Sequence, residues 1–242
     1  MAGTILLDMK DIPITPETKL SLLNETESLL NVTTQSIDEI YELIRLARRF
    51  QSSMKPEQIP FNIENAITLL KFRLFIAFLI IDLASAMRIY LNAKLQYEGL
   101  FSARQIIVII YEGYKKIYNF LNPKKNEHLL KYINTSFWVK DIGAIIKNDF
   151  PKMQNEYDGL TSRLEKYFES NFALLKMRRN LSIHYDTDSI KVYEMFSNLN
   201  IEDTYKKLIP FLDILNNMSV LTARVATLYD FRLIDKNNSP TT

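Results

Sequence analysis

The most constraining feature of this 242-residue chain is one long helical segment whose middle is apolar on every side. Residues 74–87 read LFIAFLIIDLASAM, and they lie inside a segment, residues 62–93, that Asn62 is suited to cap. A membrane-spanning helix needs about 20 predominantly apolar residues, whereas this stretch is shorter and contains Asp82. A helix that is hydrophobic all round is typical of the centre of a bundle. The sequence therefore predicts a long central helix surrounded by other helices.

Two helices are expected before this central helix, in a region that carries more acids than bases. Pro16 suits the first position of a helix that would reach about residue 30. The sequence SIDE at residues 36–39 matches a capping box, and it would open a second helix that ends near residue 52. We therefore expect an acidic helical hairpin, residues 1–53, packed on the main domain. A connection with two prolines, residues 54–61, would join the two.

The rest of the chain predicts more helices, and no segment shows the sustained alternation typical of a strand. Ser102 is expected to cap a helix that ends before Pro123, and Pro210 to bend or split the last helix. The predicted fold class is all-α: a bundle of about 7–9 helices over residues 62–234 and the hairpin, followed by a polar tail, residues 235–242. The other expected helices cover residues 127–134, 137–147, 159–182, 190–196 and 201–229.

The scarcity of several residue types excludes whole classes of chemistry. The chain has no cysteine, so it has no disulfide, no cysteine nucleophile and no thiolate metal site. Its five glycines are scattered, and none belongs to the G-x-G or G-x-x-x-x-G-K pattern of phosphate-binding loops. The two histidines, His128 and His184, cannot supply an H-E-x-x-H zinc site. We therefore expect no metal and no cofactor, and any chemistry must come from very few residues.

Charge is distributed unevenly along the chain, although the net charge is only +2. Residues 1–70 hold 6 basic and 10 acidic residues, whereas residues 115–152 hold 8 lysines and 3 acids. The basic segment is either a solvated lysine-rich face or a surface that attracts a phosphate backbone. The start of the chain contains acids and lacks a continuous apolar core, which is not typical of a secretory signal. We therefore expect a cytoplasmic protein without membrane contact.

The segment whose residue types are best suited to catalysis is residues 176–185, which read KMRRNLSIHY. Cutting RNA without a metal requires a group that moves protons and a cation that stabilises negative charge on the phosphate. Histidine suits the first task because its pKa lies near neutrality, and arginine suits the second because it is always charged and forked. On a regular helix Asn180 shares a face with His184, whereas Arg179 points away from it. Arg179 and His184 can therefore meet only if the long arginine side chain wraps around the helix, or if the helix loosens before His184.

The hexapeptide from Arg179 to His184, RNLSIH, resembles the R-x4-6-H signature of the HEPN superfamily in its R-N-x-x-x-H form. The resemblance implies an all-α bundle. Many members of this family are metal-independent ribonucleases, often toxins or defence effectors, whose motifs from two protomers meet in a dimer cleft. The resemblance also implies that Arg179 and His184 are catalytic and that Asn180 is the polar residue after the arginine. The toxin subgroup has a tyrosine two places after the histidine, where this chain has Asp186, and Tyr185 comes one place early.

Neighbouring residues and a second protomer would complete such a site. Lys176, Arg178 and Tyr185 are candidate RNA- or phosphate-binding residues, although the two basic residues also fit an ordinary charged helix surface. In-line attack places the attacking and leaving oxygens on opposite sides of phosphorus, so a single His184 is poorly placed to serve both. We therefore expect a homodimer that brings a second Arg179 and a second His184 into one cleft. The expected partners are RNA or a nucleotide, a second copy of the chain, and a protein inhibitor.

Simpler interpretations of the same residues stay open. Arg179 could form a salt bridge at a helix end, with His184 placed near a helix C-terminus. Glu112 and Asp82, which sit in apolar helices, would then pair with basic residues in the core. The aromatic residues follow helical spacing, which favours the core over base stacking. The alternative function is a non-catalytic HEPN-fold bundle that binds a protein or a nucleotide, with residues 1–53 as its docking element.

Overall fold

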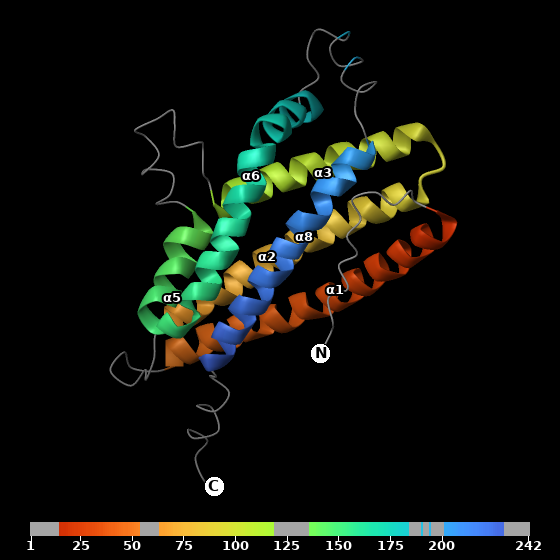
Figure 1. Ribbon diagram of the computed structural model, residues 1–242. Helices are drawn as coiled ribbons and strands as arrows, with labels where there is room; N and C mark the ends of the chain where they lie inside the picture. The colour runs from red at the N-terminus through yellow and green to blue at the C-terminus, as the bar shows by residue number, and fades with distance from the viewer. Residues whose placement is uncertain are drawn as a thin grey trace.

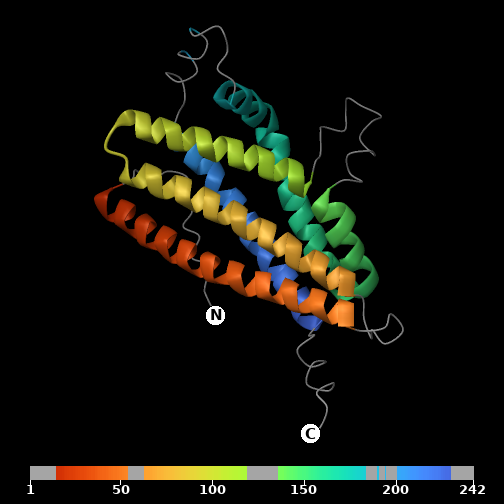
Figure 2. The ribbon, with the colours of Figure 1, turned by 180° about the vertical axis from the view of Figure 1, so that it is seen from behind.

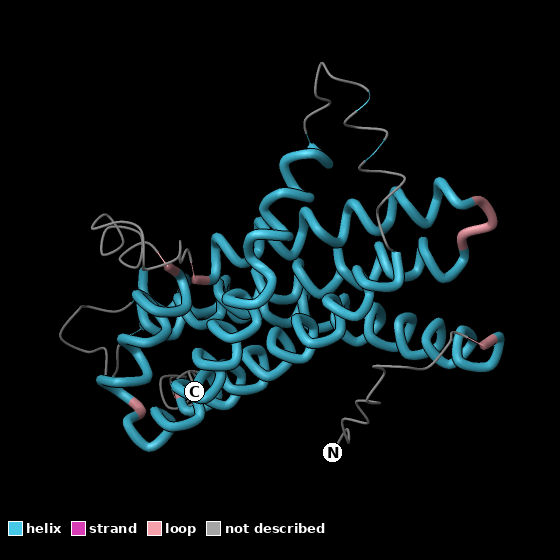
Figure 3. Tube along the Cα trace, turned by 45° about the horizontal axis from the view of Figure 1, so that its top comes forward, coloured by secondary structure: helices cyan, strands magenta, loops and turns pink. Residues whose placement is uncertain are grey.

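The computed structural model describes residues 15–53, 63–118, 136–183, 190, 194 and 201–229. Across these residues the protein is all-α, with six bounded α-helices, one short π-helix, one 3-10 turn and no strand (Figures 1 and 3). The predicted fold class is confirmed for this part of the chain. The total of about 7–9 helices stays a prediction, because the expected helix at 127–134 and most of that at 190–196 lie outside the described residues. The connection at 54–61 and the tail at 235–242 lie outside them too.

The central helix of the bundle is α2, Ile63–Asn92, as the sequence predicted (Figure 1). It packs against α1, Pro16–Ser53, against α3, Gln96–Ile117, and against α8, Ile201–Leu228. Fifteen of its 30 residues are buried, because a helix without a polar face needs neighbours on several sides. α2 is the most apolar of the long helices. Even so, no helix in the described ranges is long and apolar enough to cross a bilayer.

The predicted hairpin at residues 1–53 is wrong, because α1 is a single helix of 38 residues. Ser36, expected to cap a second helix, instead donates its hydroxyl to the carbonyl of Val32 at 2.9 Å. Serine can satisfy its hydroxyl in this way inside a continuous helix. α1 runs antiparallel along α2, where Glu27 pairs with Arg88 at 3.1 Å (Figure 2). The apolar face of α1 belongs to the same core as the other helices, so this segment is one layer of the bundle.

The predicted cap at Ser102 is also wrong, because α3 already begins at Gln96. Ser102 is fully buried inside the helix, donates to the carbonyl of Ala86 on α2, and lies 3.0 Å from the Tyr205 hydroxyl on α8. The start of α3 is stabilised instead by Glu98, whose carboxylate accepts two backbone N–H groups that precede the helix. These hydrogen bonds lower the pKa of Glu98. Ser102 thus ties three helices together rather than starting one.

The C-terminal part of the bundle follows the predicted order of helices. The π-helix η2, Phe137–Ile142, continues into α5, Gly143–Asp149, and the chain then turns through η3, Pro151–Met153. The next helix, α6, Gln154–Ile183, is the one expected at residues 159–182. α8 continues through Pro210 instead of splitting there. The break at η3 falls between the helices expected at 137–147 and 159–182, and of the two alternatives for Pro210 only the split is wrong.

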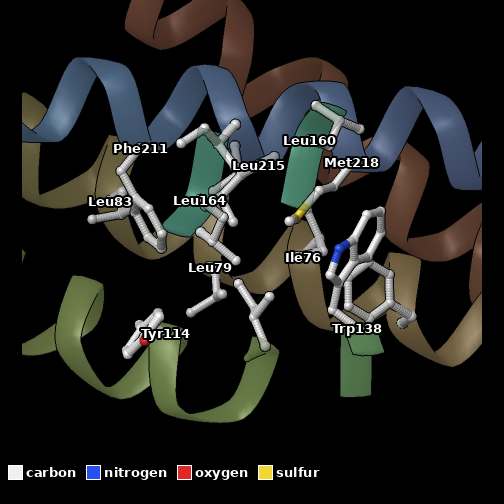
Figure 4. Packing of buried hydrophobic residues seen from close by; sticks show 14 of the residues in the cluster. Ile76, Leu79, Leu83, Tyr114, Trp138, Leu160, Leu164, Phe211, Leu215 and Met218 are labelled. Carbon is white, nitrogen blue, oxygen red and sulfur yellow. The ribbon is translucent and has the colours of Figure 1, made fainter. Parts of the chain in front are cut away.

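The buried side chains form one connected core to which all six bounded α-helices contribute. Tyr114 of α3 stacks on Phe168 of α6, with ring centroids 3.6 Å apart. Trp138 is fully buried, lies 4.8 Å from the ring of Tyr157, and donates its indole N–H to Thr161 at 2.8 Å. Figure 4 shows side chains of α2, α6 and α8 meeting between Tyr114 and Trp138. These aromatic residues belong to the core, as their helical spacing predicted.

Candidate functional site

Arg179 lies in the C-terminal part of α6, which packs against α3 (Figures 1 and 2). Its guanidinium forms an ion pair with the carboxylate of Glu112 on α3. Nη2 lies 2.7 Å from Oε1, and Nε donates to the same oxygen at 2.9 Å. The Arg179 side chain is 23% exposed and that of Glu112 is 38% exposed. The first residue of the RNLSIH motif is therefore held at the surface, where two helices meet.

A second cation, Lys115, faces the same carboxylate from α3. Its Nζ lies 3.6 Å from Oε2 of Glu112, so each carboxylate oxygen faces a different cation. Both cations also lie beside the ring of Tyr111, with Arg179 Cζ 5.6 Å and Lys115 Nζ 5.7 Å from its centroid. An aromatic ring attracts a cation placed over its face within about 6 Å. Tyr111, Glu112, Lys115 and Arg179 are called the Arg179 cluster below.

Tyr111 forms the buried floor of the Arg179 cluster. The residue is only 5% exposed, and burial raises the pKa of its hydroxyl, an effect that the charge of Arg179 partly offsets. The phenol therefore stays neutral at physiological pH, and its ring serves as a contact surface for the two cations. Tyr111 and Lys115 lie one helical turn apart on α3, which places them on the same face of that helix.

The described residues include only part of the predicted site. Arg179 is the predicted site residue whose side chain the structure places. The RNLSIH motif continues in α6 as far as Ile183. The structure therefore does not test whether Arg179 and His184 meet, and a shared site stays a prediction. The other predicted residues have side chains outside the described part of the chain: Lys176, Arg178, Asn180, His184 and Tyr185.

The simpler interpretation of Arg179, a salt bridge near a helix end, matches the contact that is observed. Glu112 pairs with basic residues, as predicted, but at the surface rather than in the core. Asp82 behaves differently. Burial raises the pKa of its carboxyl, and it forms no ion pair with another described residue. The predicted core pairing of Asp82 is therefore not found in this part of the molecule.

Neither metal-binding groups nor similar proteins point to a further function. Among the described residues, no group of three or more His, Asp or Glu side chains is arranged to hold a metal ion. Comparison of the chain with models of protein families, with curated proteins and with solved structures finds no match in any of the three. The functional argument therefore rests on the geometry of the Arg179 cluster and on the motif that contains Arg179.

Sequence reasoning missed that Tyr111 and Lys115 lie beside Arg179. The spacing of Glu112 and Lys115, three positions apart in a predicted helix, indicates only that these two can pair. No local pattern indicates that Arg179, 67 residues later, joins them. Chemically, the Arg179 cluster places two cations around one position that an anion occupies. Such a position suits a carboxylate or a phosphate.

Proposed function

We propose that this protein is a HEPN-like, metal-independent endoribonuclease of the toxin or defence type. The observation that carries the proposal is the placement of Arg179, the arginine of the RNLSIH motif, at the surface beside a second cation, Lys115. RNA cleavage gathers negative charge on the phosphate oxygens, and preorganised cations stabilise that charge in the transition state. His184, five residues later, supplies the group that exchanges protons near neutral pH.

The proposed reaction is an in-line transfer within one RNA strand. One His184 takes the proton of a ribose 2′-hydroxyl, and the 2′-oxygen attacks the adjacent phosphorus. The bond between phosphorus and the 5′-oxygen breaks, and this oxygen takes a proton from the partner's His184. The products are a 2′,3′-cyclic phosphate and a 5′-hydroxyl. Arg179 binds the non-bridging oxygens, while Lys176, Arg178, Asn180 and Tyr185 contact the RNA nearby.

The proposal requires a homodimer, because each chain offers one His184 and the two proton transfers occur on opposite sides of phosphorus. A two-fold axis beside the motif brings both copies of Arg179 and His184 into one cleft. Sedimentation of the purified protein tests this arrangement directly. A monomer at the concentration used for cleavage argues against it.

The experiment that tests the proposal compares RNA cleavage by the wild type, Arg179→Ala and His184→Ala in EDTA. Each substitution is expected to slow cleavage by at least about 100-fold, because it removes a transition-state cation or the proton-transfer group. Arg163→Ala is the matched control, since Arg163 is also an ion-paired arginine of α6 but pairs with Asp213 on α8. Equal cleavage by all four folded proteins indicates a contaminating nuclease and overturns the proposal. Toxicity on expression, relieved by His184→Ala, would support the toxin class.

A non-catalytic bundle that binds a protein or a nucleotide is the second candidate. The observation that favours it is the outer surface of α1, where Leu20, Val32 and Tyr41 are each more than half exposed. Exposed apolar side chains of this kind suit a protein partner. If this candidate is correct, the wild-type protein does not cleave RNA. Arg179→Ala and His184→Ala then leave that result unchanged.

A further inference from the structure

Two cations from different helices converge on one carboxylate in the Arg179 cluster. Arg179 contacts Oε1 of Glu112 at 2.7 and 2.9 Å, and Lys115 lies 3.6 Å from Oε2. The cluster therefore holds two positive charges and one negative charge around a single anion position. The same position is suited to the non-bridging oxygens of a phosphodiester, which carry one negative charge over two oxygens.

The two cations have a contact that does not depend on Glu112. Both lie close to the ring of Tyr111, at 5.6 Å for Arg179 and 5.7 Å for Lys115, and Tyr111 is buried between its neighbours. The side chain of Glu112 is 38% exposed, so solvent already reaches it while it contacts Arg179. Partly exposed ion pairs contribute little to stability, so breaking the contacts of Glu112 costs little free energy.

We propose that the Glu112 carboxylate is a placeholder for an RNA phosphodiester, and that Lys115 binds this phosphate together with Arg179. The inference rests on the proposed function, since it assigns the anion that Arg179 handles in RNA. The phosphate enters as Glu112 turns outward, because two anions repel each other at one position. Arg179 offers its fork and Lys115 a point charge, and no covalent bond changes in this binding step.

The opposite role for Glu112 makes an opposite prediction. A carboxylate that only orients Arg179 for RNA would weaken binding when it is neutralised. A carboxylate that competes with the phosphate would strengthen binding when it is neutralised. The sign of the change in RNA affinity on Glu112→Gln therefore distinguishes a placeholder from a positioning residue.

The test measures anisotropy of a short, fluorescein-labelled single-stranded RNA in which every ribose is 2′-O-methylated, so that the 2′-oxygen cannot attack. Glu112→Gln is expected to tighten binding by about three- to fivefold, the size of one partly exposed competing charge. Lys115→Ala and Arg179→Ala are expected to weaken it by about fivefold or more, since each removes a phosphate contact. Thermal unfolding of each variant verifies that it is folded.

Two control variants separate the cluster from general charge effects. Glu169→Gln removes one acid from an exposed position of α6, and Lys116→Ala removes the exposed lysine next to Lys115 on α3. Both are expected to stay within about twofold of the wild type, because exposed charges outside the site are screened. Competition with free AMP distinguishes the RNA strand from a mononucleotide: AMP should displace the RNA only weakly, since it offers one phosphate group. Equal displacement by AMP would make the ligand a nucleotide.

Failure of this inference differs from failure of the proposed function. If Glu112→Gln binds the methylated RNA no tighter than the wild type, or Lys115→Ala behaves like Lys116→Ala, the placeholder is overturned. Absence of binding by both the wild type and Glu112→Gln overturns it as well. If binding follows the expected order but unmodified RNA is never cut, the phosphodiester site stands and the ribonuclease proposal fails.

Discussion

The two arginines of α6 whose side chains the structure describes each form an ion pair, and these pairs differ in which partner is exposed. Arg163 pairs with Asp213 of α8, and their side chains are 48% and 13% exposed. Arg179 pairs with Glu112 of α3, and their side chains are 23% and 38% exposed. At the first pair the acid is the more buried partner, whereas at the second pair it is the arginine. Both pairs join an arginine to a carboxylate. Solvent reaches mainly the arginine in the first pair and mainly the carboxylate in the second.

The surroundings of the two acids extend this difference. The second oxygen of Asp213 accepts a hydrogen bond from the side-chain amide of Asn217 at 3.1 Å, so a neutral donor fixes it on α8. The second oxygen of Glu112 faces another cation, Lys115. The Asp213 pair is therefore a tie between α6 and α8, with its acid locked in place. The Glu112 pair places its acid between two cations at a more exposed position, and the placeholder proposal makes this acid the exchangeable member.

The largest expected difference between the two pairs appears when each arginine is replaced by lysine. Arg179→Lys keeps the charge but loses the fork that matches two phosphate oxygens, and it is expected to slow RNA cleavage by about 10- to 100-fold. Arg163→Lys is expected to leave cleavage unchanged, since Arg163 lies outside the proposed site and a lysine keeps the positive charge beside Asp213. Cleavage rates under single-turnover conditions measure both. Equal losses at the two sites would mean that Arg179 acts through the fold rather than on the phosphate.

A smaller difference is expected in stability, and in the opposite order. Asp213→Ala removes a mostly buried acid with two partners, and it is expected to lower the free energy of unfolding by about 1–2 kcal/mol. Glu112→Ala removes a more exposed acid, and the expected loss is below about 1 kcal/mol. Urea unfolding followed by circular dichroism measures both values. A loss at Glu112 that exceeds the loss at Asp213 would make the Arg179 cluster a structural tie.

Some elements of the fold could be predicted because only one environment suits them. α2 has apolar residues on every side, so the centre of a bundle was the only stable place for it. Ser36 and Ser102 were misplaced because serine suits two environments, a helix cap and a helix interior. Ser36 bonds to the preceding turn, and Ser102 bonds to neighbouring helices. Whether a serine caps depends on long-range packing, which a local pattern does not contain.

The candidate site was predictable to a smaller extent. Arg179 stood out because its motif is local in the sequence. Its contacts with Tyr111, Glu112 and Lys115 depend on how α6 crosses α3, and that crossing follows from the packing of Tyr114 on Phe168 and similar core contacts. A motif can thus identify a residue, whereas its electrostatic surroundings are set by the whole bundle.

The smallest expected difference lies in the salt dependence of RNA binding. A cation that contacts a phosphate releases a counterion, so its removal lowers the slope of log K against log salt by about 0.7 for a single strand. Arg179→Ala and Lys115→Ala are each expected to lower the slope by about this amount, whereas Arg163→Ala is expected to leave it unchanged because its partner is Asp213. Titrations of the methylated RNA at several salt concentrations measure the slope. If Arg163→Ala lowers the slope as much as Arg179→Ala does, RNA follows the whole length of α6 and the two arginines do not differ in role.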